Sequence, residues 1–110
     1  MEIISTPLDF LGVNYYSRSL IRGASQQPLA NRCETVVPIP GACYTEMGWE
    51  VYPQGLTDLL LHLHQDYALP AIYVTENGAA FADNWQPDSD LVHDPRRVNY
   101  LRLQIGRAHV

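Results

Sequence analysis

The sequence lacks the features that several large classes of protein require. It contains 7 Lys and Arg against 12 Asp and Glu, for a formal net charge of −5, and it has no basic run that could follow the phosphates of a nucleic acid. No stretch of about 18 consecutive apolar residues occurs, and residues 1–10 show no basic segment followed by an apolar core. We therefore predict no nucleic-acid partner, no membrane span, a cytoplasmic location and a small neutral ligand.

Cysteine is equally scarce. Cys33 and Cys43 lie in a segment rich in Pro and Gly and do not have CxxC spacing. They could form a disulfide, or they could be two free thiols of a cytosolic protein, which is the simpler interpretation. His62, His64 and His93 do not have the spacing of metal ligands, so we predict no metal site.

The residues that are present indicate a globular chain with two buried strands. Apolar residues make up 46% of the sequence, and aromatic residues 10%. Residues 7–16, "PLDFLGVNYY", form an apolar run rich in β-formers and predict one strand. Residues 71–78, "AIYVTENG", predict a second strand, and its continuous hydrophobicity is typical of a parallel strand covered on both faces.

A helix is predicted between these strands, over residues 53–67. Pro53 suits the first helical turn, and Pro70 marks a stop soon after the helix. The apolar positions draw one stripe along this helix: Leu56, Leu59, Leu60, Leu63 and Tyr67. The order strand, helix, strand is a βαβ unit and places the chain in the α/β class.

The remaining segments are interpreted as loops and the start of a second helix. Residues 23–48 show no sustained period and are predicted to be one long loop of functional importance. Asp94 and Pro95 look like an N-cap and first helical residue, followed by apolar positions at Val98 and Leu101, with Tyr100 as a further candidate. About one and a half helices cannot cover both faces of a sheet made of these two strands. We therefore expect further elements to be missing.

Polar side chains gather where the two predicted strands end. Asn14 and Tyr16 end the first strand, and Glu76 ends the second. In a barrel of parallel strands the residues that perform chemistry lie at these carboxyl ends. Taken singly, each has a simpler interpretation: Glu76 could be a solvated acid before an Asn-Gly turn, and Trp49 could be a core aromatic.

Four motifs in order resolve the choice. The stretches "DFLGVNYY", "MGWEVYPQGL", "IYVTENGAAF" and "VHDPRRVNYL" closely resemble the retaining β-glycosidases of glycoside hydrolase family 1, the β-glucosidase family. The resemblance covers residues 1–104. It implies a partial (β/α)8 TIM barrel that contains about strands 6 and 7 with the intervening helix. A whole barrel of this type takes about 250 residues, so the chain would be an internal fragment.

The resemblance also assigns roles to individual residues. Glu76, in the T-E-N-G motif, corresponds to the catalytic nucleophile, and Tyr16 to the tyrosine that hydrogen-bonds it. Asn14 lies in the pocket wall, and Trp49 corresponds to an aromatic platform on the aglycone side. Residues 93–101 match the start of the seventh helix and imply scaffolding only. The family's mechanism needs neither a metal nor an organic cofactor.

Retention of configuration requires a second carboxyl group about 5–5.5 Å from the nucleophile. In the family it comes from a T-x-N-E-P motif on the fourth strand, which this sequence does not contain. None of the other glutamates follows a predicted strand: Glu2, Glu34, Glu46 and Glu50. We therefore expect the chain to carry one half of a catalytic pair and to be poorly folded and inactive alone.

The expected parent activity is hydrolysis of terminal β-glucosyl residues by double displacement. Galactosides, fucosides and 6-phospho-glucosides remain alternatives, because the residues that separate them lie outside this sequence, and the oligomeric state is open. A second hypothesis is a non-catalytic sugar-binding or structural remnant that uses Trp49 and the tyrosines for stacking. A nucleotide-binding unit is excluded because "VNYYSRS" after the first strand has no GxGxxG pattern.

The last residues form a separate prediction. Residues 105–110, "IGRAHV", are what the DNA string ATC GGA AGA GCA CAC GTC would encode, and that string reads like a common sequencing adapter. We therefore expect residues 1–104 to be the glycosidase segment and residues 105–110 to be adapter read-through, which the codons of the source DNA would test.

Overall fold

The computed structural model describes residues 6–22, 35–83 and 85–108. Its elements follow in the order β1 (Leu11–Asn14), β2 (Ile21–Arg22), β3 (Thr35–Val36), α1 (Gln54–Asp66), β4 (Ile72–Glu76) and α2 (Pro95–Ala108). The βαβ unit predicted from the sequence is therefore confirmed as β1, α1 and β4. The predicted helix agrees with α1 to within one residue at each end, whereas the first strand is shorter than predicted.

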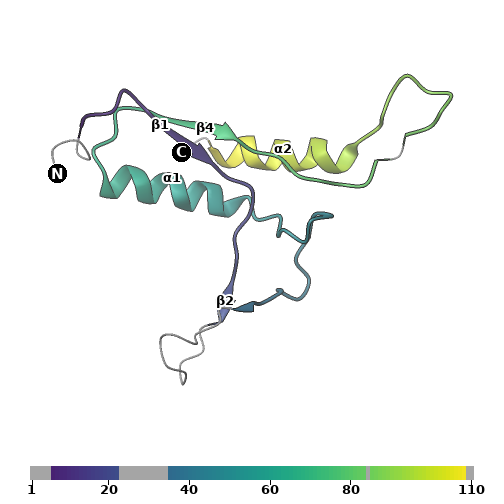
Figure 1. Ribbon diagram of the computed structural model, residues 1–110, viewed down its shortest axis with the longest axis horizontal. Helices are drawn as coiled ribbons and strands as arrows, with labels where there is room; N and C mark the ends of the chain where they lie inside the picture. The colour runs from purple at the N-terminus through teal and green to yellow at the C-terminus, as the bar shows by residue number, and fades with distance from the viewer. Residues whose placement is uncertain (1–5, 23–34, 84, 109–110) are drawn as a thin grey trace.

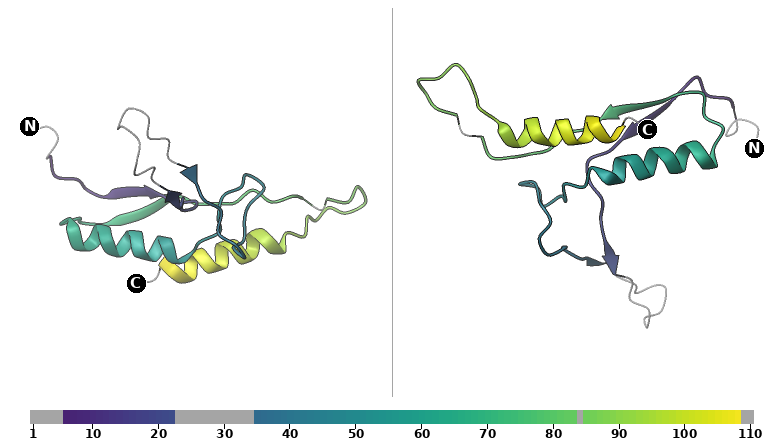
Figure 2. Two further views of the ribbon diagram at one scale, coloured as in Figure 1. Left: turned by 90° about the horizontal axis from the view of Figure 1, so that it is seen from below. Right: turned by 180° about the vertical axis from the view of Figure 1, so that it is seen from behind.

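The central sheet consists of β1 and β4, which run parallel. Leu11 faces Ile72 and Val13 faces Val74, and an irregularity after Val13 brings Asn14 opposite Glu76. Both helices lie on the same side of these strands, as the left view of Figure 2 shows. The opposite face of the sheet is bare within the described part of the chain.

α1 packs against the end of β1 to form a small core. Leu56, Leu60 and Tyr15 are its buried members. The Tyr15 hydroxyl donates a hydrogen bond to the carbonyl oxygen of Tyr52 at 2.6 Å, and burial raises the pKa of this hydroxyl to about 12. Gly55 leaves the room that Tyr15 needs, because a Cβ there would lie 2.3 Å from the tyrosine Oη. The core therefore fixes the position of Tyr15, and with it the backbone that leads into the next residue, Tyr16.

α2 begins at a well-formed cap. The carboxylate of Asp94 accepts a hydrogen bond from the backbone N–H of Arg97 at 3.0 Å, which lowers the pKa of Asp94. The Arg97 guanidinium then donates to the carbonyl oxygens of Ala79 and Phe81 at 3.1 and 2.6 Å and pairs with Asp83 at 2.7 Å. The predicted N-cap is confirmed, and α2 also ties down the segment that follows β4.

A hairpin arm projects away from the sheet (Figure 1). It consists of β2 and β3, which pair antiparallel, with Ile21 opposite Val36. The prediction that residues 23–48 form one unbroken loop is therefore wrong at β3, and Tyr44 also forms a bridge with Glu50. A two-residue strand is too short to give a period in the sequence. Residues 23–34 of the predicted loop, including Cys33, lie outside the described residues, whereas Cys43 is a free, exposed thiol.

Two predictions of burial are wrong. Tyr73 is 58% exposed and Val74 38% exposed, although the sequence of β4 predicts a strand covered on both faces. Tyr67 is 59% exposed, because the helix ends at Asp66 and Tyr67 is its extended C-cap residue.

The radius of gyration is 18.4 Å, against about 13 Å for a compact domain of this length. The apolar run of β4 is suited to neighbours that the described chain does not provide.

No helix in the described ranges is long and apolar enough to cross a membrane.

Candidate active site

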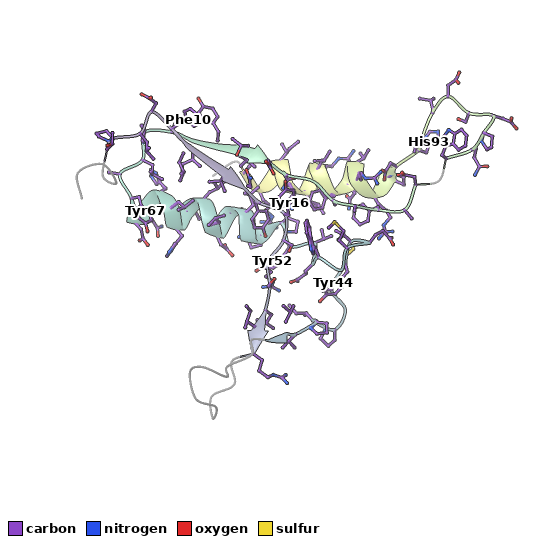
Figure 3. All side chains as sticks on the ribbon, in the orientation of Figure 1. Phe10, Tyr16, Tyr44, Tyr52, Tyr67 and His93 are labelled. Atoms are coloured by element: carbon purple, nitrogen blue, oxygen red, sulfur yellow. The ribbon has the colours of Figure 1, made fainter. Side chains whose placement is uncertain are left out.

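The candidate site lies where β1 and β4 end together. The backbone N–H of Tyr15 donates to the carbonyl oxygen of Glu76 at 3.0 Å, and Asn14 is the register partner of Glu76. Figure 3 shows Tyr16 at this meeting point, between the helices and above the hairpin arm. His93 lies far from it, on the loop before α2. The parallel pairing thus brings together the strand-end residues singled out in the sequence.

Tyr16 and Glu76 are directly hydrogen-bonded. The Tyr16 hydroxyl donates to Oε2 of Glu76 across 60 positions of sequence. This bond raises the pKa of Tyr16, because ionising the phenol would place a second negative charge against the carboxylate and remove the donor. Tyr16 therefore remains a protonated donor at neutral pH. The carboxylate keeps its other oxygen free of this hydrogen bond and is exposed, as an attacking group must be.

Asn14 and Trp49 border the same site. The Asn14 Oδ1 accepts a hydrogen bond from the Thr75 hydroxyl at 2.7 Å, which fixes the amide at the strand end. The Trp49 ring lies 5.6 Å from the Tyr16 ring, between centroids, at an interplanar angle of 54°. The site includes an open depression of about 360 Å³, lined by Asn14, Tyr15, Tyr16, Ser17, Ser19 and Trp49. Three of the predicted site residues thus line one depression, and the fourth, Glu76, accepts a hydrogen bond from Tyr16.

The loop that carries Trp49 is held by a partly buried ion pair. Glu50 is 7% exposed and accepts two hydrogen bonds from Arg18, at 2.8 and 3.0 Å. The same guanidinium lies 3.5 Å from the centre of the Tyr52 ring. The backbone N–H of Trp49 donates to the Thr45 hydroxyl at 3.1 Å. No pattern in the sequence singles out Arg18, because its partner Glu50 is distant in the chain.

Asn77 was misinterpreted from the sequence. The Asn-Gly pair predicts a turn after Glu76, but in the described chain only Gly41 and Gly48 have positive φ, and no turn is formed at residues 77–78. Instead the Asn77 Nδ2 donates to the carbonyl oxygen of Tyr15 at 2.7 Å and to the Tyr100 hydroxyl at 3.3 Å. Asn77 therefore joins the two strand ends. Tyr100 lies in the segment that the sequence analysis interpreted as scaffolding, and its hydrogen bond to this site was not predicted.

The other described glutamates are already paired elsewhere. Glu46 pairs with Arg96 at 3.3 Å, and Glu50 with Arg18, while Glu2 and Glu34 lie outside the described ranges. Within those ranges no group of three or more His, Cys, Asp or Glu could hold a metal ion. The geometry offers one exposed carboxylate with a phenol donor beside an aromatic platform.

Comparison with known proteins gives the family. Residues 1–110 match the sequence profile of glycosyl hydrolase family 1. The chain belongs to this family. β-Glucosidase A of Thermotoga maritima is 38% identical over 109 residues, which cover 98% of this chain and 23% of the relative. Thermostable β-glucosidase B of Thermobispora bispora is 42% identical over 113 residues, again 23% of the relative.

Solved structures of family 1 enzymes agree with the fold. A family 1 β-glucosidase from Thermotoga maritima superposes with a TM-score of 0.81 at 37% identity, covering 97% of this chain and 23% of that one. A β-glucosidase from Thermotoga maritima in complex with noeuromycin gives a TM-score of 0.80 at 36% identity, covering 97% of this chain and 23% of that one. The chain spans about a quarter of the length of these glycosidases. This coverage agrees with the predicted partial barrel and with the bare face of the β1–β4 sheet.

Proposed function

We propose that this chain supplies the nucleophilic half of a retaining β-glycosidase site that acts on terminal β-glucosyl residues. The observation that carries the proposal is the hydrogen bond from Tyr16 to Glu76 at the end of two parallel strands. The β-glucosidase names of the relatives favour a glucoside among the possible glycosides.

In the first step an oxygen of the Glu76 carboxylate attacks the anomeric carbon. A bond forms between that oxygen and the sugar, and the bond from the anomeric carbon to the aglycone oxygen breaks. The leaving oxygen takes a proton from a carboxylic acid, which the rest of the barrel must supply. Positive charge develops on the sugar during this step, and the adjacent carboxylate stabilises it.

In the second step water replaces the enzyme on the same carbon. The second carboxyl group, now ionised, removes a proton from the water, whose oxygen bonds to the anomeric carbon as the ester bond to Glu76 breaks. Two displacements restore the original configuration. Tyr16 holds the carboxylate for both steps, Asn14 offers an amide for a sugar hydroxyl, and Trp49 offers an exposed aromatic face for the aglycone.

The proposal is tested in a graft, defined here as Thermotoga maritima β-glucosidase A with its 109 matched residues replaced by those of this chain. The host supplies the missing strands and the second carboxyl group. We expect the folded graft to hydrolyse an aryl β-glucoside and to release β-glucose first, as followed by proton NMR before mutarotation.

The unaltered host serves as the positive control, and a cooperative urea transition establishes that the graft is folded. A folded graft that releases α-glucose first, or that hydrolyses no β-glycoside, would contradict the proposed function.

A further inference from the structure

We propose that Asn77 and Tyr100 form a positioning pair that sets the Tyr16 hydroxyl against Glu76. This inference rests on the proposed function, because it assigns a task to residues that surround the proposed nucleophile. Neither residue bonds the Glu76 side chain in the structure, so both act through Tyr16 and its backbone.

The pair joins three elements at one point. Tyr100 lies on α2 and is 2% exposed, and its hydroxyl donates to the carbonyl oxygen of Tyr16 at 3.1 Å. Asn77 follows β4 and donates to the carbonyl oxygen of Tyr15 at 2.7 Å and to the Tyr100 hydroxyl at 3.3 Å. Two consecutive carbonyl groups of the segment after β1 are therefore held from α2 and from the end of β4.

These contacts matter because of where Tyr16 lies. Its ring borders an open depression, and its hydroxyl must reach a carboxylate on the neighbouring strand. Fixing the two carbonyl groups fixes the peptide planes on either side of the Tyr16 Cα, and so the direction in which the side chain leaves the backbone. A displacement of about 1 Å in a catalytic group can lower the rate about a hundredfold.

The Tyr100 hydroxyl is suited to keeping both of its hydrogen bonds at neutral pH. Burial raises the pKa of its hydroxyl, so the group stays protonated and keeps its donor across the neutral range. The hydroxyl acts as donor to Tyr16 and acceptor from Asn77 at the same time, which uses its ordinary hydrogen-bonding capacity. Phenylalanine at this position would keep the buried ring and remove only the bridge.

A double-mutant cycle in the graft tests the pair. We expect Tyr100→Phe to lower kcat for an aryl β-glucoside about tenfold with KM nearly unchanged, because the effect falls on transition-state geometry. Tyr16→Phe should lower kcat further. The double variant should match Tyr16→Phe alone, because Tyr100 has no hydroxyl left to position.

Tyr44→Phe is the matched control. It also removes a tyrosine hydroxyl bonded to the backbone, here accepting from the N–H of Ile39 at 2.7 Å, outside the depression. We expect it to leave kcat and KM unchanged. Asn77→Ala provides the second variant and should lower kcat without adding to the effect of Tyr16→Phe.

Three outcomes would overturn the positioning pair: multiplicative losses in the double variant, a loss confined to KM, or a Tyr100→Phe variant with normal kcat and only a lower urea midpoint. Failure of the proposed function has a different signature, because the unmutated graft would then show no retaining hydrolysis at all. If the unmutated graft hydrolyses the substrate normally but the losses of Tyr100→Phe and Tyr16→Phe multiply in the double variant, only the positioning role is overturned and the proposed function stands.

Discussion

Glu76→Gly in the graft is expected to lower kcat for an aryl β-glucoside by about ten-thousandfold or more. Glycine removes the oxygen that would form the covalent bond, while the host still provides the acid. Substrate must reach Glu76 in the graft, so removal of its side chain should leave a space that water can fill rather than a sealed apolar cavity. The loss should therefore be chemical, and the urea midpoint should change little.

Azide makes this prediction specific. A small anion can occupy the space left by the carboxylate and attack the anomeric carbon from the same side. We expect sodium azide to restore turnover of a substrate with a good leaving group and to yield the α-glucosyl azide, because only one displacement then occurs. Product configuration is read by proton NMR.

Glu46→Gly is the control for this experiment. Glu46 is an exposed acid on the Trp49 loop, paired with Arg96 rather than with a site residue. Its loss should leave kcat unchanged and azide without effect. If Glu76→Gly and Glu46→Gly behave alike, Glu76 is not the nucleophile, and the non-catalytic sugar-binding hypothesis is favoured instead.

The isolated chain of 110 residues is expected to show no glycosidase activity and no cooperative unfolding transition. Its buried apolar cluster is small, the sheet has two strands, and Phe10, Tyr73 and Trp85 are each more than half exposed. Two parallel strands with one bare face cannot bury enough apolar surface to offset the backbone entropy of ordering, about 1–2 kcal/mol for each residue. The sequence also lacks the T-x-N-E-P motif that would carry the acid the mechanism requires.

Circular dichroism during a urea titration, together with an aryl-glucoside assay of the same sample, measures both expectations. The graft carries the same residues within a complete barrel and is the control. A sharp urea transition in the isolated chain together with hydrolysis at a rate near that of the graft would refute the prediction.

The sequence predicted the elements that have a clear hydrophobic pattern, whether a helical stripe or a continuous apolar run. The leucine stripe located α1, and the apolar run before Glu76 located β4. Short elements were missed, because β2 and β3 contain two residues each and no period can be read from two positions. The sequence of β4 predicts burial on both faces, and this prediction is wrong. The strand is apolar because it is suited to packing against elements that the described chain does not include.

Some residues of the candidate site could likewise be predicted from the sequence, and others could not. Asn14, Tyr16 and Glu76 could be singled out because they end strands, and pairing of those strands is what brings them together. Asn77 and Tyr100 could not, because hydrogen bonds between side chains and distant carbonyl groups leave no pattern in one sequence. The prediction that residues 105–110 are adapter read-through stays a prediction. α2 extends through Ala108, and helix geometry does not identify the origin of the codons.

The most direct measurement is the mass of the Glu76 peptide after the graft reacts with 2,4-dinitrophenyl 2-deoxy-2-fluoro-β-glucoside. The fluorine destabilises the charged transition states, and the good leaving group allows the first displacement to proceed, so that the covalent intermediate accumulates. We predict one added 2-deoxy-2-fluoroglucosyl group, located by fragmentation on Glu76 and absent in Glu76→Gln. Inactivation with the label on another residue, or turnover without any label, would contradict the assignment of Glu76 as nucleophile.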